Sequence, residues 1–357
     1  MRLPRDRPSD AEPEPFGLGG LPRPVAAVVG AGGVLGAAHV GVGYALEQRG
    51  FAPDMIVGTS VGALNGAIAA AHPDEAAPYL DNVWSRLRRR DVYPFGYASS
   101  RVSLFNDRGL RRLITESGLP SRIEDLAVPF TAVAMDLASG AAALLDHGDL
   151  PSALLASAAI PGMLPPVERE GRTLVDGGVV AYVPVLAALR AGAASVVVLS
   201  TGPESSPLPP DIPRRRASAI AARAGLLLLH HQIQRDLHEV AQRIPTVLLP
   251  TGIEVWPSPW DFGHTQRLIS TAARTAGHFL DSLRIDGPGL YRVDAVTGAA
   301  EGDGLAGGAG TEAGRSDGAP ARPGTAPTGR RAAPPDPGTH RAGPGEPPPP
   351  YVRGGGP

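Results

Sequence analysis

The sequence predicts an α/β fold, in which a mostly parallel sheet is built from strands that alternate with helices. Two short β-branched runs that end in glycine, "VAAVVG" at 25–30 and "DMIVG" at 54–58, have the length and composition of buried strands. Each is followed by a helical pattern of alanine and aliphatic residues, at 33–50 and at 60–72. This β-α-β-α order implies parallel strands that are connected by crossover helices.

The same alternation continues along the chain. Strands are predicted at 130–140, 141–147, 173–178, 195–201 and 245–252. Helices are predicted at 150–160, 183–192, 218–244 and 264–283. Pro161 ends the first of these helices, and a turn at Ser139-Gly140 joins the first two strands. One continuous α/β domain accounts for all of these elements.

The composition divides the chain into three segments. Residues 1–23 are polar and proline-rich and residues 286–357 are rich in Gly, Pro and Ala, so we expect a disordered leader and a disordered tail around a domain at 24–285. The leader lacks the apolar core of a secretion signal, and no apolar run approaches the ~18 residues of a transmembrane helix. We therefore expect a cytoplasmic protein. Leu226–Leu229 form an apolar helical turn that suits either a core position or a face lying on a membrane.

The composition also excludes several kinds of chemistry. The formal net charge of −2 gives no broad attraction to nucleic acid, so we expect no nucleic-acid partner. The chain has no cysteine, and its 33 basic residues are all arginine, which removes disulfides, thiol nucleophiles and lysine Schiff bases. No H-E-x-x-H or comparable spacing of metal ligands occurs, so we expect no metal and no cofactor.

A candidate nucleophile lies where the second predicted strand meets the second helix. Gly58, Ser60 and Gly62 form a G-x-S-x-G pattern. In a nucleophile elbow, a sharp strand-to-helix turn exposes the serine hydroxyl and directs the N-terminus of the following helix at the reacting carbonyl. Glycines flank the serine because bulkier residues would clash in so tight a turn. A small-residue turn without chemistry has the same pattern, so a base and an oxyanion hole must decide between the two.

A glycine-rich loop from Gly30 to Gly36 follows the first predicted strand. Its backbone N–H groups could bind negative charge at a helix N-terminus, with Gly32 and Gly33 as the donors of an oxyanion hole. A dinucleotide-binding loop and close packing of a helix on the sheet are the alternatives. The dinucleotide fingerprint is incomplete, because Leu35 stands where its third glycine would fall.

A candidate base follows much later in the chain. Asp176 ends a predicted strand and is followed by Gly177 and Gly178. A carboxylate at a strand end that faces the same crevice as Ser60 can accept the proton of the serine hydroxyl. The alternative is a capping role within a turn, which Asp-Gly pairs often have.

Taken together, these stretches resemble the patatin-like phospholipase family. That family has a glycine-rich oxyanion loop, a G-x-S-x-G nucleophile and an aspartate in a D-G-G or D-G-A motif, in the order found here. Other segments that resemble the family are "GAAHVGVGYALEQRG", "GTSVGALNGA", "AMDLASG", "SAAIPGMLPPV" and "PSPWDF". The resemblance extends over residues 25–283.

The resemblance implies a three-layer α/β/α fold and a serine acyl hydrolase that cleaves lipid acyl esters through an acyl-enzyme. Ser60 would be the nucleophile and Asp176 the general base of a Ser-Asp dyad. The oxyanion donors would be the N–H groups of Gly32, Gly33 and Val34. The motif glycines that would support them are Gly30, Gly36, Gly58, Gly62, Gly177 and Gly178. The implied partner is a lipid or acyl-ester substrate, reached through transient contact with a membrane surface, and no oligomeric state is implied.

Three positions depart from the family pattern. Ala31 replaces the first glycine of a loop that often reads G-G-G-x-R-G, and Leu35 replaces its arginine. Tyr182 stands where the family often has asparagine before a Val-Pro pair. These departures bear on the identity of the oxyanion donors and on the support of the aspartate loop. They leave two alternatives open, a patatin-like pseudoenzyme and a dinucleotide-binding α/β module.

A catalytic histidine is the remaining alternative, because an α/β-hydrolase has a histidine after its acid. The histidines that follow Asp176 are His230, His231, His238, His264 and His278. All of them lie in helical patterns, and the elbow follows only one βα unit, which is too early for that fold. His39, on the first predicted helix, is expected to have a structural role. The sequence therefore favours an aspartate as the base for Ser60.

Overall fold

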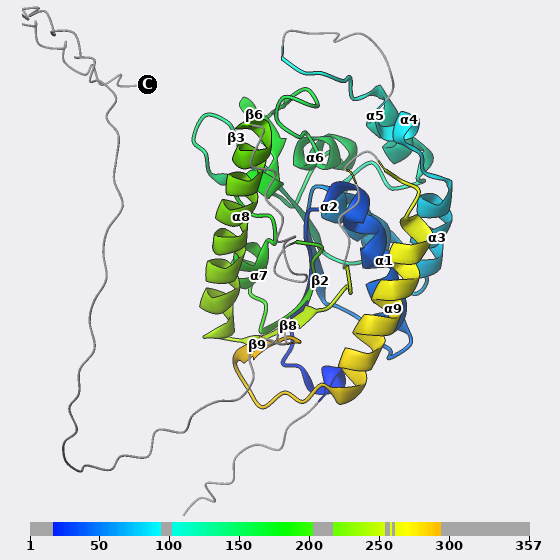
Figure 1. Ribbon diagram of the computed structural model, residues 1–357, viewed down its shortest axis with the longest axis vertical. Coiled ribbons are helices and arrows are strands. Elements are labelled where there is room, and N and C mark those ends of the chain that lie inside the picture. Colours follow the sequence, from blue (N-terminus) through cyan, green and yellow to red (C-terminus); the bar gives the residue numbers. More distant parts are fainter. Residues whose placement is uncertain (1–16, 94–101, 203–216, 254–257, 259–260, 294–357) are drawn as a thin grey trace, which may run out of the picture. The chain divides into compact units, whose positions relative to one another are not determined.

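The computed structural model describes residues 17–93, 102–202, 217–253, 258 and 261–293 (Figure 1). These residues belong to one compact unit of the chain, residues 1–297. Within the described part, a nine-stranded sheet has the order β5-β6-β3-β2-β1-β7-β8-β9, with β4 paired to β3. The strands are β1 (Val25–Val29), β2 (Met55–Thr59), β3 (Phe130–Asp136), β4 (Ala142–Leu145), β5 (Val167–Arg169), β6 (Arg172–Asp176), β7 (Ser195–Leu199), β8 (Pro245–Leu249) and β9 (Gly289–Tyr291).

The sheet has a parallel part and an antiparallel end. Strands β3, β2, β1, β7, β8 and β9 pair in parallel, whereas β4, β5 and β6 pair antiparallel with their neighbours. All five residues of β1 are buried, as expected for a central strand covered on both faces. The pairing of Asp176 with Ala134 places the end of β6 next to β3, one strand away from β2.

Helices cover both faces of the sheet, so the three-layer α/β/α architecture is confirmed (Figure 1). One face carries α1 (Ala37–Glu47), α2 (Val61–Ala71), α3 (Ala76–Arg86), α6 (Leu150–Ser157) and α9 (Thr265–Ser282). The other face carries α7 (Val185–Arg190) and α8 (Ala217–Ala241). Side chains of β1 alternate between the two cores, because successive residues of a strand point to opposite faces: Val25, Ala27 and Val29 pack with the first group of helices, and Ala26 and Val28 with the second.

Several shorter or more polar elements are not predicted by the sequence pattern. They are α3, α4 (Arg89–Val92), α5 (Arg108–Glu116), β5 and β9. In α3 the signal is present, because its buried residues Ala77, Leu80 and Trp84 have helical spacing. In the arginine-rich α5 only Leu110 and Ile114 are buried, so the apolar stripe is too short to stand out. Short 3₁₀ helices are η1 (Leu18–Gly20), η2 (Gly33–Gly36), η3 (Ile123–Asp125) and η4 (Gly177–Val179).

Ordered structure extends past the predicted domain limits of 24 and 285 on both sides. The helix η1 precedes the first limit, and Leu21 is buried in the core. The strand β9 follows the second limit and pairs in parallel with β8. These two short elements lie in segments that we expected to be disordered. Residues 1–16 of the expected leader and residues 294–357 of the expected tail lie outside the described residues.

The long helix α8 differs between its two halves. Its C-terminal half buries Ile233, Leu237 and Val240 against the sheet. In its N-terminal half Leu227 is exposed, and Leu228 has 73% of its surface accessible. The apolar turn at 226–229 is therefore not simply a core segment. No helix within the described ranges is long and apolar enough to cross a bilayer.

Elements late in the chain complete the core around early ones. Strand β7 pairs with β1 along its whole length, from Val25 opposite Ser195 to Val29 opposite Leu199. Helix α9 packs on α1 at Gly41, where a Cβ atom would lie 2.1 Å from the carbonyl oxygen of Ile269. Backbone contact this close requires glycine at that position.

Candidate active site

Ser60 lies in a strained turn between β2 and α2. Its backbone angles, φ 57° and ψ −125°, are in a region that non-glycine residues rarely adopt, at a cost of about 1–3 kcal/mol. The flanking glycines make the turn sterically possible. A Cβ atom on Gly58 would lie 2.5 Å from the carbonyl oxygen of Gly62, and one on Gly62 would lie 2.2 Å from the carbonyl oxygen of Val29. This is the geometry of a nucleophile elbow.

The structure brings Asp176 to Ser60. The Ser60 hydroxyl donates to Oδ2 of Asp176 at 2.5 Å, and the Gly178 amide donates to Oδ1 of the same carboxylate at 2.7 Å. Gly177, between Asp176 and Gly178 in the chain, packs against β3. A Cβ atom on Gly177 would lie 2.2 Å from the Val133 carbonyl oxygen. Both members of the pair are buried, with 6% of Ser60 and 5% of Asp176 accessible.

Burial changes the basicity of this carboxylate. It raises the pKa of Asp176 to about 6, while the hydrogen bonds from Ser60 and from the Gly178 amide oppose that rise. The phenol of Tyr93, just after α4, is also buried, and both burial and the charge of Asp176 raise its pKa. A carboxylate of this kind is ionised at neutral pH and is a stronger base than an exposed aspartate. It can take the proton of the Ser60 hydroxyl.

The glycine-rich loop presents unpaired backbone donors beside this pair. The amides of Gly32, Gly33 and Val34 reach no hydrogen-bond acceptor among the described residues, as expected at the start of a helix such as η2. Gly32 and Gly33 have positive φ angles of 153° and 57°, and a Cβ atom on Gly32 would lie 1.9 Å from Oγ1 of Thr201. The loop therefore needs glycine at Gly32 for space as well as for backbone conformation.

Two close approaches show that the loop lies next to the serine–aspartate pair. On one side, a Cβ atom on Gly178 would lie 3.4 Å from the methyl group of Ala31. On the other side, a Cβ atom on Gly36 would lie 2.5 Å from a methyl group of Val61, the residue after Ser60. The three motifs singled out in the sequence thus meet at one place, at the carboxyl ends of β1 and β2.

Comparison with known proteins relates part of the chain to one family. Residues 27–189 match the model of the family described as patatin-like phospholipase. Residues 27–189 therefore belong to the patatin-like phospholipase family. An NTE family protein of Mycobacterium tuberculosis is 35% identical over 185 residues, which are 51% of this chain and 51% of that protein. The chain thus matches about half the length of this mycobacterial relative.

Other relatives match about half of the chain at lower identity. Lysophospholipase NTE1 of Mycosarcoma maydis is 32% identical over 185 residues, 49% of this chain and 9% of that protein. Human patatin-like phospholipase domain-containing protein 6 is 30% identical over 182 residues, 50% of this chain and 13% of that protein. Among solved structures, VipD from Legionella pneumophila matches with a TM-score of 0.39 and 12% identity, over 74% of this chain and 68% of that chain.

The departures from the family pattern have structural explanations in this patatin-like domain. The Ala31 amide donates to the carbonyl oxygen of Tyr182 at 2.8 Å, so Ala31 is not among the unpaired donors of the loop. Leu35 is buried in the core, an environment that suits an apolar side chain. Tyr182 supports the loop through its backbone carbonyl, a contact that does not depend on side-chain identity.

A serine that the sequence analysis did not single out supports the elbow. Ser157, the last residue of α6, accepts a hydrogen bond from the Ser60 amide at 2.9 Å and donates one to the Val133 carbonyl oxygen at 2.6 Å. On the other side of the turn, Thr59 donates to the Ala181 carbonyl oxygen at 2.9 Å. The strained turn is thus tied to β3 and to the loop after Asp176. Ser157 has no sequence signal of its own beyond a polar residue in an apolar helix.

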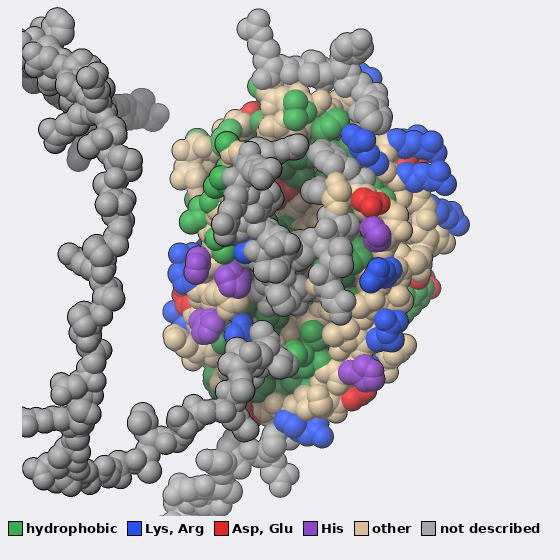
Figure 2. All heavy atoms as spheres, viewed as in Figure 1, with side chains coloured by type: hydrophobic (Ala, Val, Ile, Leu, Met, Phe, Trp, Pro, Cys, Tyr) green, Lys and Arg blue, Asp and Glu red, His purple; other side chains and the backbone are tan. Residues whose placement is uncertain are grey.

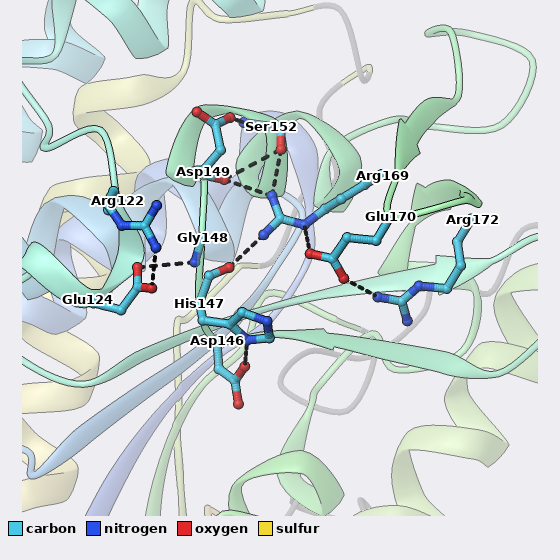
Figure 3. A network of polar contacts seen from close by, with 10 residues as sticks. All are labelled: Arg122, Glu124, Asp146, His147, Gly148, Asp149, Ser152, Arg169, Glu170 and Arg172. Carbon is cyan, nitrogen blue, oxygen red and sulfur yellow. Dashed lines mark hydrogen bonds and ion pairs between the residues drawn. The ribbon is translucent and has the colours of Figure 1, made fainter.

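The start of α6 is held by a polar network around Arg169 of β5 (Figure 3). The guanidinium of Arg169 donates to the carbonyl oxygens of His147 and Asp149 and to the Ser152 hydroxyl, at 2.5, 2.9 and 2.6 Å. Asp149 in turn caps α6 by accepting from the Ser152 amide at 2.8 Å. The surrounding ion pairs, such as that between Arg122 and Glu124, are exposed and add little stability. Arg169 therefore fixes the helix that carries Ser157.

No histidine within the described ranges bonds to Ser60 or Asp176. The histidines that follow Asp176 belong to the flanking helices or their ends: His230, His231 and His238 to α8, and His264 and His278 to α9. His39 is buried, with its Nδ1 atom 3.3 Å from the side-chain nitrogen of Asn65. Among the described residues, no cluster of three or more acidic or histidine side chains could hold a metal ion.

Proposed function

We propose that this domain hydrolyses acyl esters of lipids through a covalent acyl-enzyme on Ser60. The observation that carries the proposal is the 2.5 Å hydrogen bond from the strained Ser60 hydroxyl to the buried Asp176 carboxylate. The family match and the lysophospholipase among the relatives support a lipid ester as the substrate. The proposal gives each of the three motifs one chemical role.

In the acylation step, the Ser60 oxygen attacks the ester carbonyl carbon while its proton passes to Asp176. The electron pair of the carbonyl moves to its oxygen, and the amides of Gly32, Gly33 and Val34 stabilise that oxyanion. When the tetrahedral intermediate collapses, the bond to the alcohol breaks, and the alcohol leaves with the proton from Asp176. The acyl group remains on Ser60 as an ester.

Deacylation repeats the sequence with water in place of serine. Asp176 removes a proton from the water molecule as its oxygen attacks the acyl carbon, and a second oxyanion forms at the same amides. Collapse releases the carboxylic acid, and the proton held by Asp176 returns to the Ser60 oxygen. The cycle requires no electron transfer, and proton transfer through Asp176 closes it.

We also propose that the domain meets its substrate through transient contact with a lipid surface. Val179, in the turn that follows Asp176, has 52% of its surface exposed. The side chain of Gln232 on α8 donates to the carbonyl oxygen of the next residue, Val180. Gln232 follows Leu228 by four residues, so the exposed leucines lie about one helical turn from the contact of α8 with the aspartate loop. Figure 2 shows hydrophobic side chains on the side of the molecule where α8 lies. An amphipathic surface of this kind suits the boundary of a bilayer.

The test is a panel of phospholipids, lysophospholipids and p-nitrophenyl esters, each supplied to wild type, Ser60→Ala and Leu228→Gln. Ser60→Ala should abolish hydrolysis of every ester and labelling by a fluorophosphonate, while thermal unfolding remains a single cooperative transition. Leu228→Gln should slow hydrolysis of esters in vesicles and leave that of the soluble p-nitrophenyl esters unchanged.

Three results would count against the proposal. Hydrolysis that survives in Ser60→Ala would rule out an acyl-enzyme on Ser60. A wild-type protein without labelling or hydrolysis would favour a pseudoenzyme, and stabilisation of that protein by NAD(P) would favour a dinucleotide-binding module. If Leu228→Gln slows the hydrolysis of soluble esters as much as that of esters in vesicles, the proposed contact with a lipid surface is ruled out.

A further inference from the structure

A buried polar cluster lies behind the glycine-rich loop and outside the serine–aspartate pair. The side-chain nitrogen of Asn65 donates to the carbonyl oxygen of Gly36 at 3.0 Å and lies 3.3 Å from Nδ1 of His39. The indole nitrogen of Trp84 donates to the side-chain oxygen of Asn65 at 3.1 Å. All three side chains are buried, so these bonds form without competition from water.

The chemistry of the donors fixes how this cluster is protonated. An indole N–H can only donate, so the Asn65 atom that faces Trp84 must be the oxygen, and the NH₂ group must face Gly36 and His39. Nδ1 of His39 then has to accept, which puts the ring proton on Nε2. Burial lowers the pKa of His39 to about 3, so the ring stays neutral and remains an acceptor at any working pH.

Asn65 thereby joins the two elements on which the proposed reaction depends. Asn65 lies on α2, and Ser60 is the residue at which this helix begins, little more than one turn earlier. Gly36 is the last residue of η2, whose first residues, Gly33 and Val34, carry the unpaired amides. His39 extends the contact into α1, which continues from η2. One side chain is thus bonded to both the end of the loop and the helix that follows it.

We propose that Asn65 is a positioning residue that sets the oxyanion donors of η2 relative to the Ser60 hydroxyl. The inference rests on the proposed hydrolysis at Ser60 and adds a residue that touches neither substrate nor dyad. Hydrogen bonds to an oxyanion form only if the donors lie at the right place in the transition state. A shift of about 1 Å can slow a reaction by about 100-fold. Loss of the bonds from Asn65 should therefore lower kcat and leave KM unchanged.

The test compares Asn65→Leu with Trp84→Phe. The leucine is close in size to asparagine and removes all three bonds, whereas Trp84→Phe removes one bond and leaves those from Asn65 to Gly36 and His39 in place. Asn65→Leu should lower kcat on a soluble ester by about 10- to 100-fold with KM within about twofold of wild type. Trp84→Phe should stay within about threefold of wild-type kcat.

Two further measurements separate positioning from general damage. The pH at which kcat/KM reaches half its plateau should be the same in Asn65→Leu as in wild type, because Asp176 and its bond to Ser60 are untouched. Affinity for an alkyl trifluoromethyl ketone, which forms an oxyanion on serine, should fall in parallel with kcat. If Asn65→Leu does not fold, Asn65→Asp at pH 8 keeps the acceptor for Trp84 and loses the donors to Gly36 and His39.

The inference is overturned if the Asn65 variants retain kcat within about threefold of wild type, or if Trp84→Phe loses as much as they do. Failure of the proposed function has a different signature, because wild type itself would then hydrolyse no ester. Amide hydrogen exchange at Leu35, whose amide donates to the Gly32 carbonyl oxygen at 3.1 Å within the loop, would still decide the positioning role in that case. Faster exchange there in Asn65→Leu than in Trp84→Phe supports it, and equal exchange overturns it.

Discussion

Ser60 and Asp176 are held in place in different ways. Ser60 lies in the parallel part of the sheet, in a turn that depends on backbone contacts which only glycine permits, at Gly58 and Gly62. Asp176 lies at the antiparallel end and reaches Ser60 through the pairing of β6 with β3. Around it, one close approach of the backbone at Gly177 is combined with hydrogen bonds, including that of the Gly178 amide to its carboxylate.

The two residues differ in how far along the chain their supporting contacts lie. The contacts that make the elbow lie within a few residues of Ser60 and against the neighbouring strand β1, so a short motif encodes them. Asp176 is 116 residues from Ser60, and Ser157 is 97 residues from it. Steric contacts at the elbow leave no room for substitution, whereas hydrogen bonds at the other end can be lost one at a time. The two regions should therefore respond differently to mutation.

The largest effect on stability is expected from Gly62→Ala. The added methyl group would lie 2.2 Å from the Val29 carbonyl oxygen, so α2 has to move away from β1. We expect a loss of about 3 kcal/mol in the free energy of unfolding, at the upper end of what overpacking usually costs. Gly43→Ala on α1 is the matched control, because its methyl group would meet Ala77 at an ordinary 3.4 Å and glycine weakens a helix interior. Denaturant unfolding measures both, and equal stability of the two variants would contradict the steric account of the elbow.

A smaller effect, of opposite sign, is expected from Asp176→Asn. The folded pKa of about 6 lies above the ordinary value of 3.8, so the folded protein binds this proton more tightly than the unfolded chain does. Wild-type stability therefore falls as pH rises from about 4 to 6 and stays lowered above that window. The amide variant lacks this loss and should be more stable than wild type by about 2 to 3 kcal/mol at pH 8, with no difference below pH 4.

Urea unfolding across this pH range measures the effect, and Asp54→Asn provides a control of opposite sign. The hydrogen bonds that Asp54 accepts from Arg23 and from the Val25 amide lower its pKa, so that variant should lose stability at neutral pH. The wild-type kcat/KM should rise with pH through about 6, because only ionised Asp176 accepts the serine proton. An Asp176→Asn variant with full activity, or without a gain in stability above pH 6, would argue against a desolvated base.

The smallest of the three effects is expected from Ser157→Ala, which probes the link between the two regions. The change leaves the Ser60 amide and the Val133 carbonyl oxygen without their buried partner. We expect a loss of about 2 kcal/mol in stability and about a tenfold loss in kcat, since the turn is no longer held. Ser195→Ala is the control, because this buried serine donates to the Pro22 carbonyl oxygen at the far end of β7. The control should lose stability without losing kcat. If Ser157→Ala and Ser195→Ala lose kcat equally, Ser157 has a purely structural role.

The same difference in range explains how much the sequence could predict. The early strands and the turns at Ser60 and at Gly32 and Gly33 were predicted from short patterns, because the constraints that shape them are local, but the same patterns left the chemical roles of these turns open. Residue composition alone left Asp176 with a capping role as an alternative, and only the resemblance to a family joined it to Ser60. Hydrogen bonds between distant segments leave no periodic signal, so the supporting residues Ser157 and Asn65 were not found.

The contacts of β7 and α9 have a consequence for the limits of the domain. Sequence similarity to the family model ends at residue 189. Strand β1, however, pairs with β7 along one of its two edges, and the backbone of α1 contacts that of α9 at Gly41. A fragment cut at that limit would expose an unpaired strand and an uncovered helix, both of which favour aggregation. The unit that is recognised by similarity is thus smaller than the unit that can fold, and an expressible fragment has to include β7 through α9.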